Sequence, residues 1–257
     1  MSNNKLLEVI NLKKSFGGIQ AVNVSNLMFT ENILTSIIGP NGAGKTTFFD
    51  LISRFQSQDD GEIYFEGKNI SSSQPYRIAR LGMVRTFQLT KVFERMNVLE
   101  NLMFAGSTTK NDSFISSIIK FPSQKEYEEE LKNKAYEVMK LLNIEQMANS
   151  YARELSGGQK KLLELGRAIV KSPRVLLLDE PLAGVNPKLS EQILEIIDNL
   201  IIEGKTVLMV EHNIEAVMRV SARVVVMAQG EIIADGSPNE IRADEKVIDA
   251  YLGSTNE

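Results

Sequence analysis

The sequence contains no cysteine and only one histidine. The lack of cysteine excludes disulfide bonds, thiolate metal sites and zinc clusters, and it fits a reducing compartment. Basic residues are not in excess either: 29 Lys and Arg stand against 33 Asp and Glu, for a net charge of −4. Because a dominant basic face is the usual footprint of nucleic-acid binding, we expect no nucleic-acid partner.

Long hydrophobic runs are also missing. No stretch approaches the ~18 consecutive apolar residues of a membrane-spanning helix. The first residues, MSNNKLLEVINLKKSFGG, lack the apolar core and the cleavage site of a signal peptide. No repeat or low-complexity tract is present. We therefore expect a cytoplasmic protein, whose role at a membrane would be peripheral.

The hydrophobic pattern predicts an α/β fold with a mainly parallel sheet. The 257 residues are enough for one large domain, predicted over 1–257. Strand patterns alternate with helical ones, and several strands are almost entirely apolar, which is typical of buried parallel strands. The expected strands are Leu6–Leu12, Val22–Thr30, Leu34–Ile38, one within QDDGEIYFEG, Met83–Phe87, RVLLLDE, TVLMV and a pair within RVVVMAQGEIIADG. The expected helices are Lys45–Phe55, Lys188–Ile202 and a short one after His212.

A long central stretch, from Gln88 to Arg167, has helical periodicity instead. Its clearest part is KEYEEELKNKAYEVMKLLN, in which charged residues occupy one face of the expected helix. The opposite face carries Tyr127, Leu131, Ala135, Val138, Leu141 and Leu142. We predict a helical subdomain over 89–167, inserted within the domain.

The stretch from Gly39 to Thr46, GPNGAGKT, matches the pattern GxxxxGK[ST] in full. An expected strand precedes it and an expected helix follows, which is the context that a phosphate-binding loop needs. Backbone N–H groups from Asn41 to Thr46, including those of Gly42, Ala43 and Gly44, are expected to surround phosphates. Lys45 is expected to reach the β- and γ-phosphates and the Thr46 hydroxyl to bind Mg²⁺. The alternative is a glycine-rich turn that only caps a helix.

A pair of acids ends the apolar strand RVLLLDE. Asp179 is suited to complete the coordination of Mg²⁺, and Glu180 to orient or deprotonate a water molecule. Ligands of parallel α/β sheets bind at the carboxyl ends of the strands, where these acids fall. The alternative is a strand that simply meets solvent.

The segment LSGGQKKLLELGRAIV predicts a second anion-binding helix terminus. Ser156 is a natural N-cap residue, and Gly157 and Gly158 leave the first turn open. One nucleotide has no evident need for two such termini. Alone, the segment is equally well explained as an ordinary helix cap.

The motifs GPNGAGKTT, LSGGQ, LLLDEP and VEHN, in this order and at these distances, resemble the ATPase subunit of an ABC transporter. The resemblance covers nearly the whole chain. It implies a P-loop NTPase fold of the ABC ATPase type, with an N-terminal antiparallel β subdomain and the inserted helical subdomain. It also implies ATP and Mg²⁺ as cofactors and a head-to-tail dimer. Each ATP would lie between the loop of one subunit, up to Thr47, and the segment Ser156–Gln159 of the other.

Further roles follow from the same resemblance. Phe16 would stack on adenine, with Val22 beside it, and Gln88 would sense Mg²⁺ and the attacking water. His212 would contact the γ-phosphate, although a lone histidine is more often structural or a metal ligand. Asn186 departs from the family pattern, which has aspartate at this position of LAGVNP.

Three stretches narrow the resemblance: VRTFQLTKVFERMNVLENLMFA, EPLAGVNP and DAYLG. They resemble the larger ATPase of importers for branched-chain and other neutral hydrophobic amino acids. The implied partners are a second ATPase subunit, like or unlike, two membrane permease subunits that meet residues 89–104, and, indirectly, an extracytoplasmic substrate-binding protein. The implied location is the inner face of the plasma membrane. The ATPases of urea import, lipopolysaccharide export and soluble iron–sulfur assembly remain alternatives.

Overall fold

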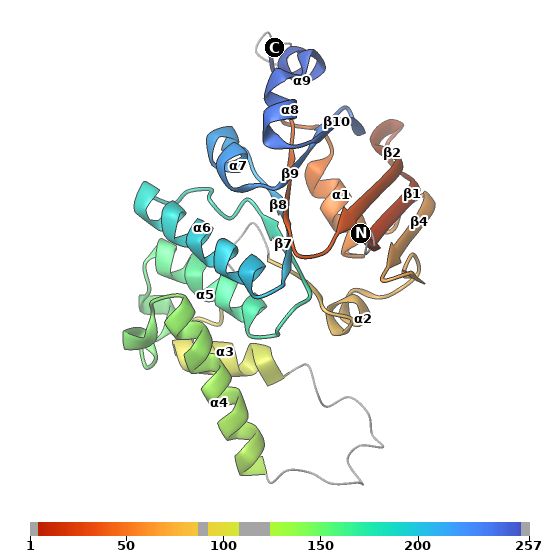
Figure 1. Ribbon diagram of the computed structural model, residues 1–257. Coiled ribbons are helices and arrows are strands. Elements are labelled where there is room, and N and C mark those ends of the chain that lie inside the picture. Colours follow the sequence, from red (N-terminus) through yellow and green to blue (C-terminus); the bar gives the residue numbers. More distant parts are fainter. Residues whose placement is uncertain (1–4, 87–91, 108–123, 253–257) are drawn as a thin grey trace. The chain divides into compact units, whose positions relative to one another are not determined.

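The computed structural model describes residues 5–86, 92–107 and 124–252. They form two compact units (Figure 1), which we call the sheet unit and the helical unit. The sheet unit comprises 1–85, 174–183 and 197–257, and the helical unit comprises 86–173 and 184–196. The boundaries predicted for a single domain with an insertion at 89–167 stay a prediction.

A six-stranded sheet dominates the sheet unit, in the order β10-β9-β3-β8-β7-β6. The five strands from β9 to β6 are parallel, and β10 runs antiparallel to β9. Every residue of β3, β7 and β8 is buried, as expected for strands covered on both faces. The strands are β3 Leu34–Ile38, β6 Met83–Arg85, β7 Val175–Asp179, β8 Thr206–Val210, β9 Arg223–Ala228 and β10 Glu231–Gly236. The predicted parallel core sheet is confirmed.

The second sheet of this unit is antiparallel, in the order β2-β1-β4-β5. Its strands are β1 Lys5–Phe16, β2 Ile19–Thr30, β4 Asp60–Phe65 and β5 Lys68–Asn69. The alternating burial along β1 and β2 agrees with the period of two in their sequences. Both strands are longer than expected, because they continue to the tight Gly17–Gly18 turn that joins them. The predicted N-terminal antiparallel sheet is confirmed.

Helix α1, Lys45–Ile52, belongs to one hydrophobic core with residues of both sheets. Phe48 and Phe49 are completely buried in it, and this fixes the helix whose first turn follows the glycine-rich loop. The expectation that this helix reaches Phe55 is wrong. Arg54 adopts a left-handed conformation, with φ 63°, which ends the helix at Ile52.

The helical unit is built from α3, α4, α5 and the first part of α6, with two short 3₁₀ turns. The buried side of α4 includes Ala135 and Val138, and Leu142, the first residue after the helix, is buried as well. These belong to the face that its periodicity predicts. The bounds are α3 Val98–Ser107, α4 Gln124–Leu141, η1 Glu145–Met147, η2 Ala152–Glu154, α5 Gly157–Ile169 and α6 Pro187–Ile202.

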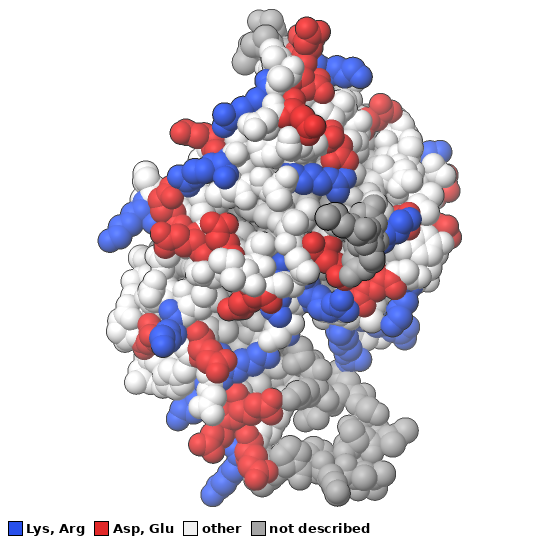
Figure 2. Space-filling view, viewed as in Figure 1, with Lys and Arg blue, Asp and Glu red and all other residues white. Residues whose placement is uncertain are grey.

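Four short helices complete the sheet unit: α2 Pro75–Arg80, α7 Ile214–Val220, α8 Pro238–Ala243 and α9 Glu245–Leu252. Only α7 is anticipated by the sequence analysis. Within the described ranges, no helix combines the length and the apolar character needed to span a membrane. On the face shown in Figure 2, Lys and Arg side chains are intermixed with Asp and Glu side chains.

Candidate functional site

The glycine-rich loop joins β3 to α1 at the carboxyl end of β3. Two of its glycines have positive φ and touch neighbouring backbone: a Cβ at Gly39 would lie 2.0 Å from Met227 O, and one at Gly44 would lie 2.2 Å from Ala21 O. Any larger residue would push this loop away from the strands that support it. The loop conformation is thus encoded by glycine at these two positions.

The first turn of α1 leaves backbone N–H groups open. Its N-cap, Gly44, makes no side-chain cap, and the first helical hydrogen bond runs from Phe48 N–H to Gly44 O at 2.8 Å. The helix therefore supplies no partner for the N–H groups of Lys45, Thr46 and Thr47. These groups border a cavity of about 260 Å³. Its lining is Ala21, Asn41, Gly42, Ala43, Gly44, Lys45, Thr46, Thr47, Glu180 and His212.

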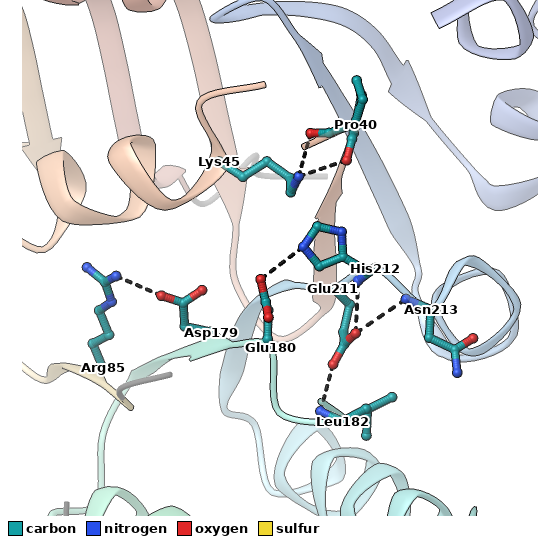
Figure 3. A network of polar contacts seen from close by, with 10 residues as sticks. Pro40, Lys45, Arg85, Asp179, Glu180, Leu182, Glu211, His212 and Asn213 are labelled. Carbon is teal, nitrogen blue, oxygen red and sulfur yellow. Dashed lines mark hydrogen bonds and ion pairs between the residues drawn. The ribbon is translucent and has the colours of Figure 1, made fainter. Parts of the chain in front are cut away.

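Lys45 is folded back onto the loop (Figure 3). Its Nζ donates hydrogen bonds to Gly39 O at 2.7 Å and Pro40 O at 2.9 Å. Burial lowers the pKa of the Lys45 ammonium, and the charges of Glu180 and Asp179 oppose that shift. An anion that enters the cavity would favour the charged form further. The loop thus carries a cation beside its open N–H groups, as the sequence motif predicts.

Asp179, the last residue of β7, is buried, and a hydrogen bond holds one of its two carboxylate oxygens. Its Oδ2 accepts a hydrogen bond from Arg85 Nη2 at 2.8 Å, while Arg85 Nη1 donates to Asp50 Oδ1 at 2.5 Å. The other oxygen, Oδ1, is buried and has no hydrogen-bond partner among the residues described. A buried carboxylate oxygen with no donor beside it suits a cation. The sequence analysis missed Arg85; its only signal is a charged residue within a buried strand.

Glu180 and His212 come together from two different loops. His212 Nε2 lies 2.9 Å from Glu180 Oε1, and both residues line the cavity beside Lys45 (Figure 3). Glu180 has a positive φ of 49°, an unfavourable conformation for a residue with a side chain. Its backbone N–H donates to Val210 O at 2.9 Å, which ties the Glu180 loop to the end of β8. The structure therefore places a carboxylate and an imidazole in contact next to the glycine-rich loop.

In the helical unit, Ser156 caps α5. Ser156 Oγ accepts a hydrogen bond from Gln159 N–H at 3.3 Å, and Gln159 Oε1 accepts one from Ser156 N–H at 2.8 Å. This reciprocal capping box fixes the side chains of both residues. Gly157, which has no side chain, stands at the open end of the helix. Gly158 faces Leu189 of α6 so closely that a Cβ would lie 2.5 Å from Leu189 Cδ2. Ser156, Gly158 and Gln159 line an open cavity of about 740 Å³.

Asn186, the residue that departs from the family pattern, caps α6. Its Oδ1 accepts a hydrogen bond from Leu189 N–H at 2.9 Å, and Pro187 occupies the first helical position. Asparagine and aspartate are about equally good N-caps. The position thus keeps its local structural role despite the substitution.

We expect Asn186→Ala to lower the free energy of unfolding by about 0.5–2 kcal/mol, because the Leu189 N–H loses its cap. Asn186→Asp should stay within about 0.5 kcal/mol of the unsubstituted chain, since its carboxylate caps equally well. Urea unfolding checks both values. Asn199→Ala, at an exposed position inside α6, is the matched control and should not destabilise the chain. Equal effects at positions 186 and 199 would contradict a capping role.

Comparison with known proteins decides the family. The profile described as "ABC transporter" matches residues 22–183, which include the phosphate loop, the capped terminus of α5 and the Asp179–Glu180 pair. The chain belongs to the ABC transporter family.

A second profile, "Branched-chain amino acid ATP-binding cassette transporter", matches residues 231–255 of this ABC cassette. The probable branched-chain amino acid transport ATP-binding protein LivG of Archaeoglobus fulgidus is 41% identical over 250 residues, 97% of this chain and 96% of LivG. The high-affinity branched-chain amino acid transport ATP-binding protein BraF of Pseudomonas aeruginosa is 41% identical over 249 residues, 96% of this chain and 98% of BraF. The crystal structure of an ABC-transporter ATP-binding cassette in its ADP conformation has 35% identity and a TM-score of 0.83, covering 97% of this chain and 99% of that one. The predicted family and fold class are confirmed.

Phe16 and Val22, both predicted for the nucleotide site of this ABC cassette, are not among the residues that line the cavity. Phe16, at the end of β1, is 45% exposed, so its ring is accessible for stacking. Val22 is completely buried in the hydrophobic core. Gln88 lies outside the described residues. The roles expected for all three stay predictions.

The cassette also contains one contact that the sequence analysis missed. Tyr251, on α9, makes a hydrogen bond with the backbone of Gly39, the first residue of the phosphate loop. Burial raises the pKa of the Tyr251 phenol to about 12, so the phenol stays neutral at physiological pH. Helix α9, which lies within the segment 231–255 matched by the second profile, therefore contacts the phosphate loop.

Proposed function

We propose that this chain is the ATP-hydrolysing subunit of an importer for branched-chain or other neutral amino acids. One observation carries the catalytic part: the phosphate loop, Glu180 and His212 line a single cavity. The assignment of amino acids as the substrate rests on two similarities. One is to LivG and BraF over nearly the whole chain, and the other is to the branched-chain profile at residues 231–255.

Nucleotide binding would use the groups that the loop leaves open. The N–H groups of the first turn of α1 suit phosphate oxygens, since they belong to residues that line the cavity and they have no partners in the helix. Lys45 has three N–H donors, and the Gly39 and Pro40 carbonyls take two of them. The remaining donor and the positive charge are suited to the β- and γ-phosphates.

The residues present fit a Mg²⁺ ion. Asp179 Oδ1 is buried without a donor, and Thr46 exposes its hydroxyl at the start of α1. We propose that these two groups, with Gln88, hold the ion together with phosphate oxygens, the usual mode for Mg²⁺ in nucleotide sites. When bound, Mg²⁺ supplies neutralisation of the phosphate charge. Arg85 would orient Asp179 by holding its Oδ2.

For hydrolysis, we assign the proton transfer to Glu180. The carboxylate would take a proton from the attacking water as the water oxygen bonds to the γ-phosphorus and the bond to the leaving ADP oxygen breaks. His212, 2.9 Å from Glu180, is suited to orient that carboxylate and to donate to the γ-phosphate. Both roles depend on the two side chains meeting at the cavity.

The capped end of α5 would serve the nucleotide of a second ATPase subunit. Its open first turn, with Gly157 exposed beside Ser156, is a suitable anion site on a separate surface cavity. A head-to-tail dimer, of two copies or of unlike subunits, would give each nucleotide both a loop and a capped terminus. Two sites per dimer would then form only when two subunits close on ATP.

Contact with the permease subunits is proposed at the helical unit. Phe93 and Phe104 pack edge to face at 4.9 Å and remain 39% and 47% exposed. Both lie in the predicted docking stretch 89–104, of which 89–91 fall outside the described residues. Exposed aromatic pairs of this kind are typical of protein–protein interfaces. Through such a contact the chain would sit on the inner face of the plasma membrane, with the substrate-binding protein on the other side.

The function is tested by purifying the tagged chain from detergent extracts with the membrane proteins that accompany it and reconstituting them in proteoliposomes. We expect MgATP on the side of the chain to drive accumulation of radiolabelled leucine and not of urea. The Glu180→Gln chain serves as the inactive control. Recovery of the chain without any membrane protein would favour a soluble scaffold, and uptake of urea alone would assign the substrate of the related importer.

A further inference from the structure

Glu211 is a buried acid to which neither the sequence analysis nor the proposed mechanism gives a role. It follows the last residue of β8 and is 3% exposed. Its Oε1 accepts a hydrogen bond from Leu182 N–H at 2.6 Å, and its Oε2 accepts one from His212 N–H at 2.9 Å (Figure 3). A longer contact of 3.4 Å joins Oε2 to Asn213 N–H. The carboxylate thus bridges two loops of the sheet unit.

The two loops are those that carry the acid–base pair. Leu182 is two residues beyond Glu180, and His212 directly follows Glu211 in the sequence. Hydrogen bonds from backbone N–H to an ionised carboxylate are short and about twice as strong as neutral ones. The carboxylate itself is buried, and so is its bond to Leu182 N–H. Together with the bond from Glu180 N–H to Val210 O, it fixes the separation of the loops from both sides.

We infer that Glu211 is a positioning residue, which sets the 2.9 Å contact between Glu180 and His212 by holding the backbone beside each of them. The inference rests on the proposed function, because it assigns catalytic work to that pair. It extends the function to a residue that is not among those lining the cavity. A carboxylate is required, since each of its two oxygens serves a different loop.

Glu211→Gln is the sharpest test. The amide has nearly the same size but only one acceptor oxygen, so its NH₂ group must face one of the two N–H donors. One loop would then shift. We expect kcat for ATP hydrolysis to fall about 10²-fold, the effect of a misplacement of about 1 Å, while MgATP affinity stays within about threefold. Glu215→Gln removes the same charge at an exposed position of α7 and should behave like the unsubstituted chain.

Two further measurements separate positioning from a merely structural role. In a double-mutant cycle with His212→Ala, the two substitutions should be far from additive: Glu211→Gln should add less than about threefold to the loss caused by His212→Ala alone. His212 is also the only histidine of the chain, so its Hε1 proton gives one assignable NMR signal. Glu180→Gln should shift that signal when it is the only substitution, and much less when it is combined with Glu211→Gln.

The outcomes are distinct. Unchanged kcat in Glu211→Gln, or fully multiplicative losses in the cycle, would overturn the inference and leave the proposed function intact. Normal hydrolysis by both His212→Ala and Glu180→Gln would overturn the proposed function and the inference with it. If Glu211→Gln does not fold, Glu211→Asp keeps both oxygens and the charge but is too short to reach both loops, and the same three comparisons apply to it.

Discussion

A Glu180→Gln chain is expected to bind MgATP with nearly normal affinity and to hydrolyse it about 10²- to 10⁴-fold more slowly. The amide keeps the size of the carboxylate, so Lys45, Thr46 and Asp179 remain available to the nucleotide. It lacks a basic oxygen that can take the proton of the attacking water. Phosphate release under saturating MgATP measures the loss, and Glu215→Gln, an exposed acid of the same unit, is the charge-matched control.

The same variant should accumulate as an ATP-bound dimer. With turnover blocked, the phosphates stay between the loop of one subunit and the capped end of α5 in the other. Sedimentation with and without ATP detects the change in mass. If the natural partner is an unlike subunit, its own site still turns over, so the corresponding substitution belongs in both chains. Near-normal turnover would remove Glu180 from the catalytic role, and a monomer insensitive to ATP would argue against the shared sites.

Lys45→Ala should weaken ATP binding about 10- to 10²-fold. The remaining N–H donor of Lys45 can make one charge-assisted hydrogen bond to phosphate, which contributes about 1.5–3 kcal/mol, and each 1.4 kcal/mol is a factor of about ten. The fold should survive, because Lys45 lines the cavity and does not belong to the hydrophobic core. Titration with a fluorescent ATP analogue measures the affinity, and thermal unfolding without nucleotide checks the fold.

Lys68→Ala is the control for this loss of charge, since Lys68 is an exposed lysine of the same unit on β5. Its ATP affinity should equal that of the unsubstituted chain. An affinity of the Lys45→Ala chain within about threefold of the original would contradict the phosphate-binding role of the loop.

The sequence predicts those parts of this structure that are encoded locally. The strands β3 and β8 are found at the predicted residues, because each is a run whose residues are all buried. The start of α5 can likewise be predicted from Ser156, because this N-cap accepts its hydrogen bond from a residue only three positions away. The order of the motifs places the phosphate loop and the acid pair at the strand ends, where the structure has them.

The supports of the site are not local, and sequence reasoning missed them. Arg85 contacts Asp179 across 94 positions of the chain, and Glu211 contacts Leu182 across 29. A charged residue within a buried strand signals that some partner exists, but not which one. The early end of α1 was missed for another reason: Arg54 takes a left-handed conformation for which arginine has no preference.

The left-handed backbone of Glu180 lowers the stability of the fold, although the side chain of this residue is the one proposed for hydrolysis. Glycine adopts this conformation without cost, whereas most other residues lose about 1 kcal/mol or more. A screen that ranks variants by thermal stability would therefore favour glycine at position 180 and discard the group assigned to the chemistry. Under the proposed function, the unfavourable φ of 49° at this position is tolerated for the sake of the carboxylate. Stability-guided engineering of this cassette has to leave position 180 untouched.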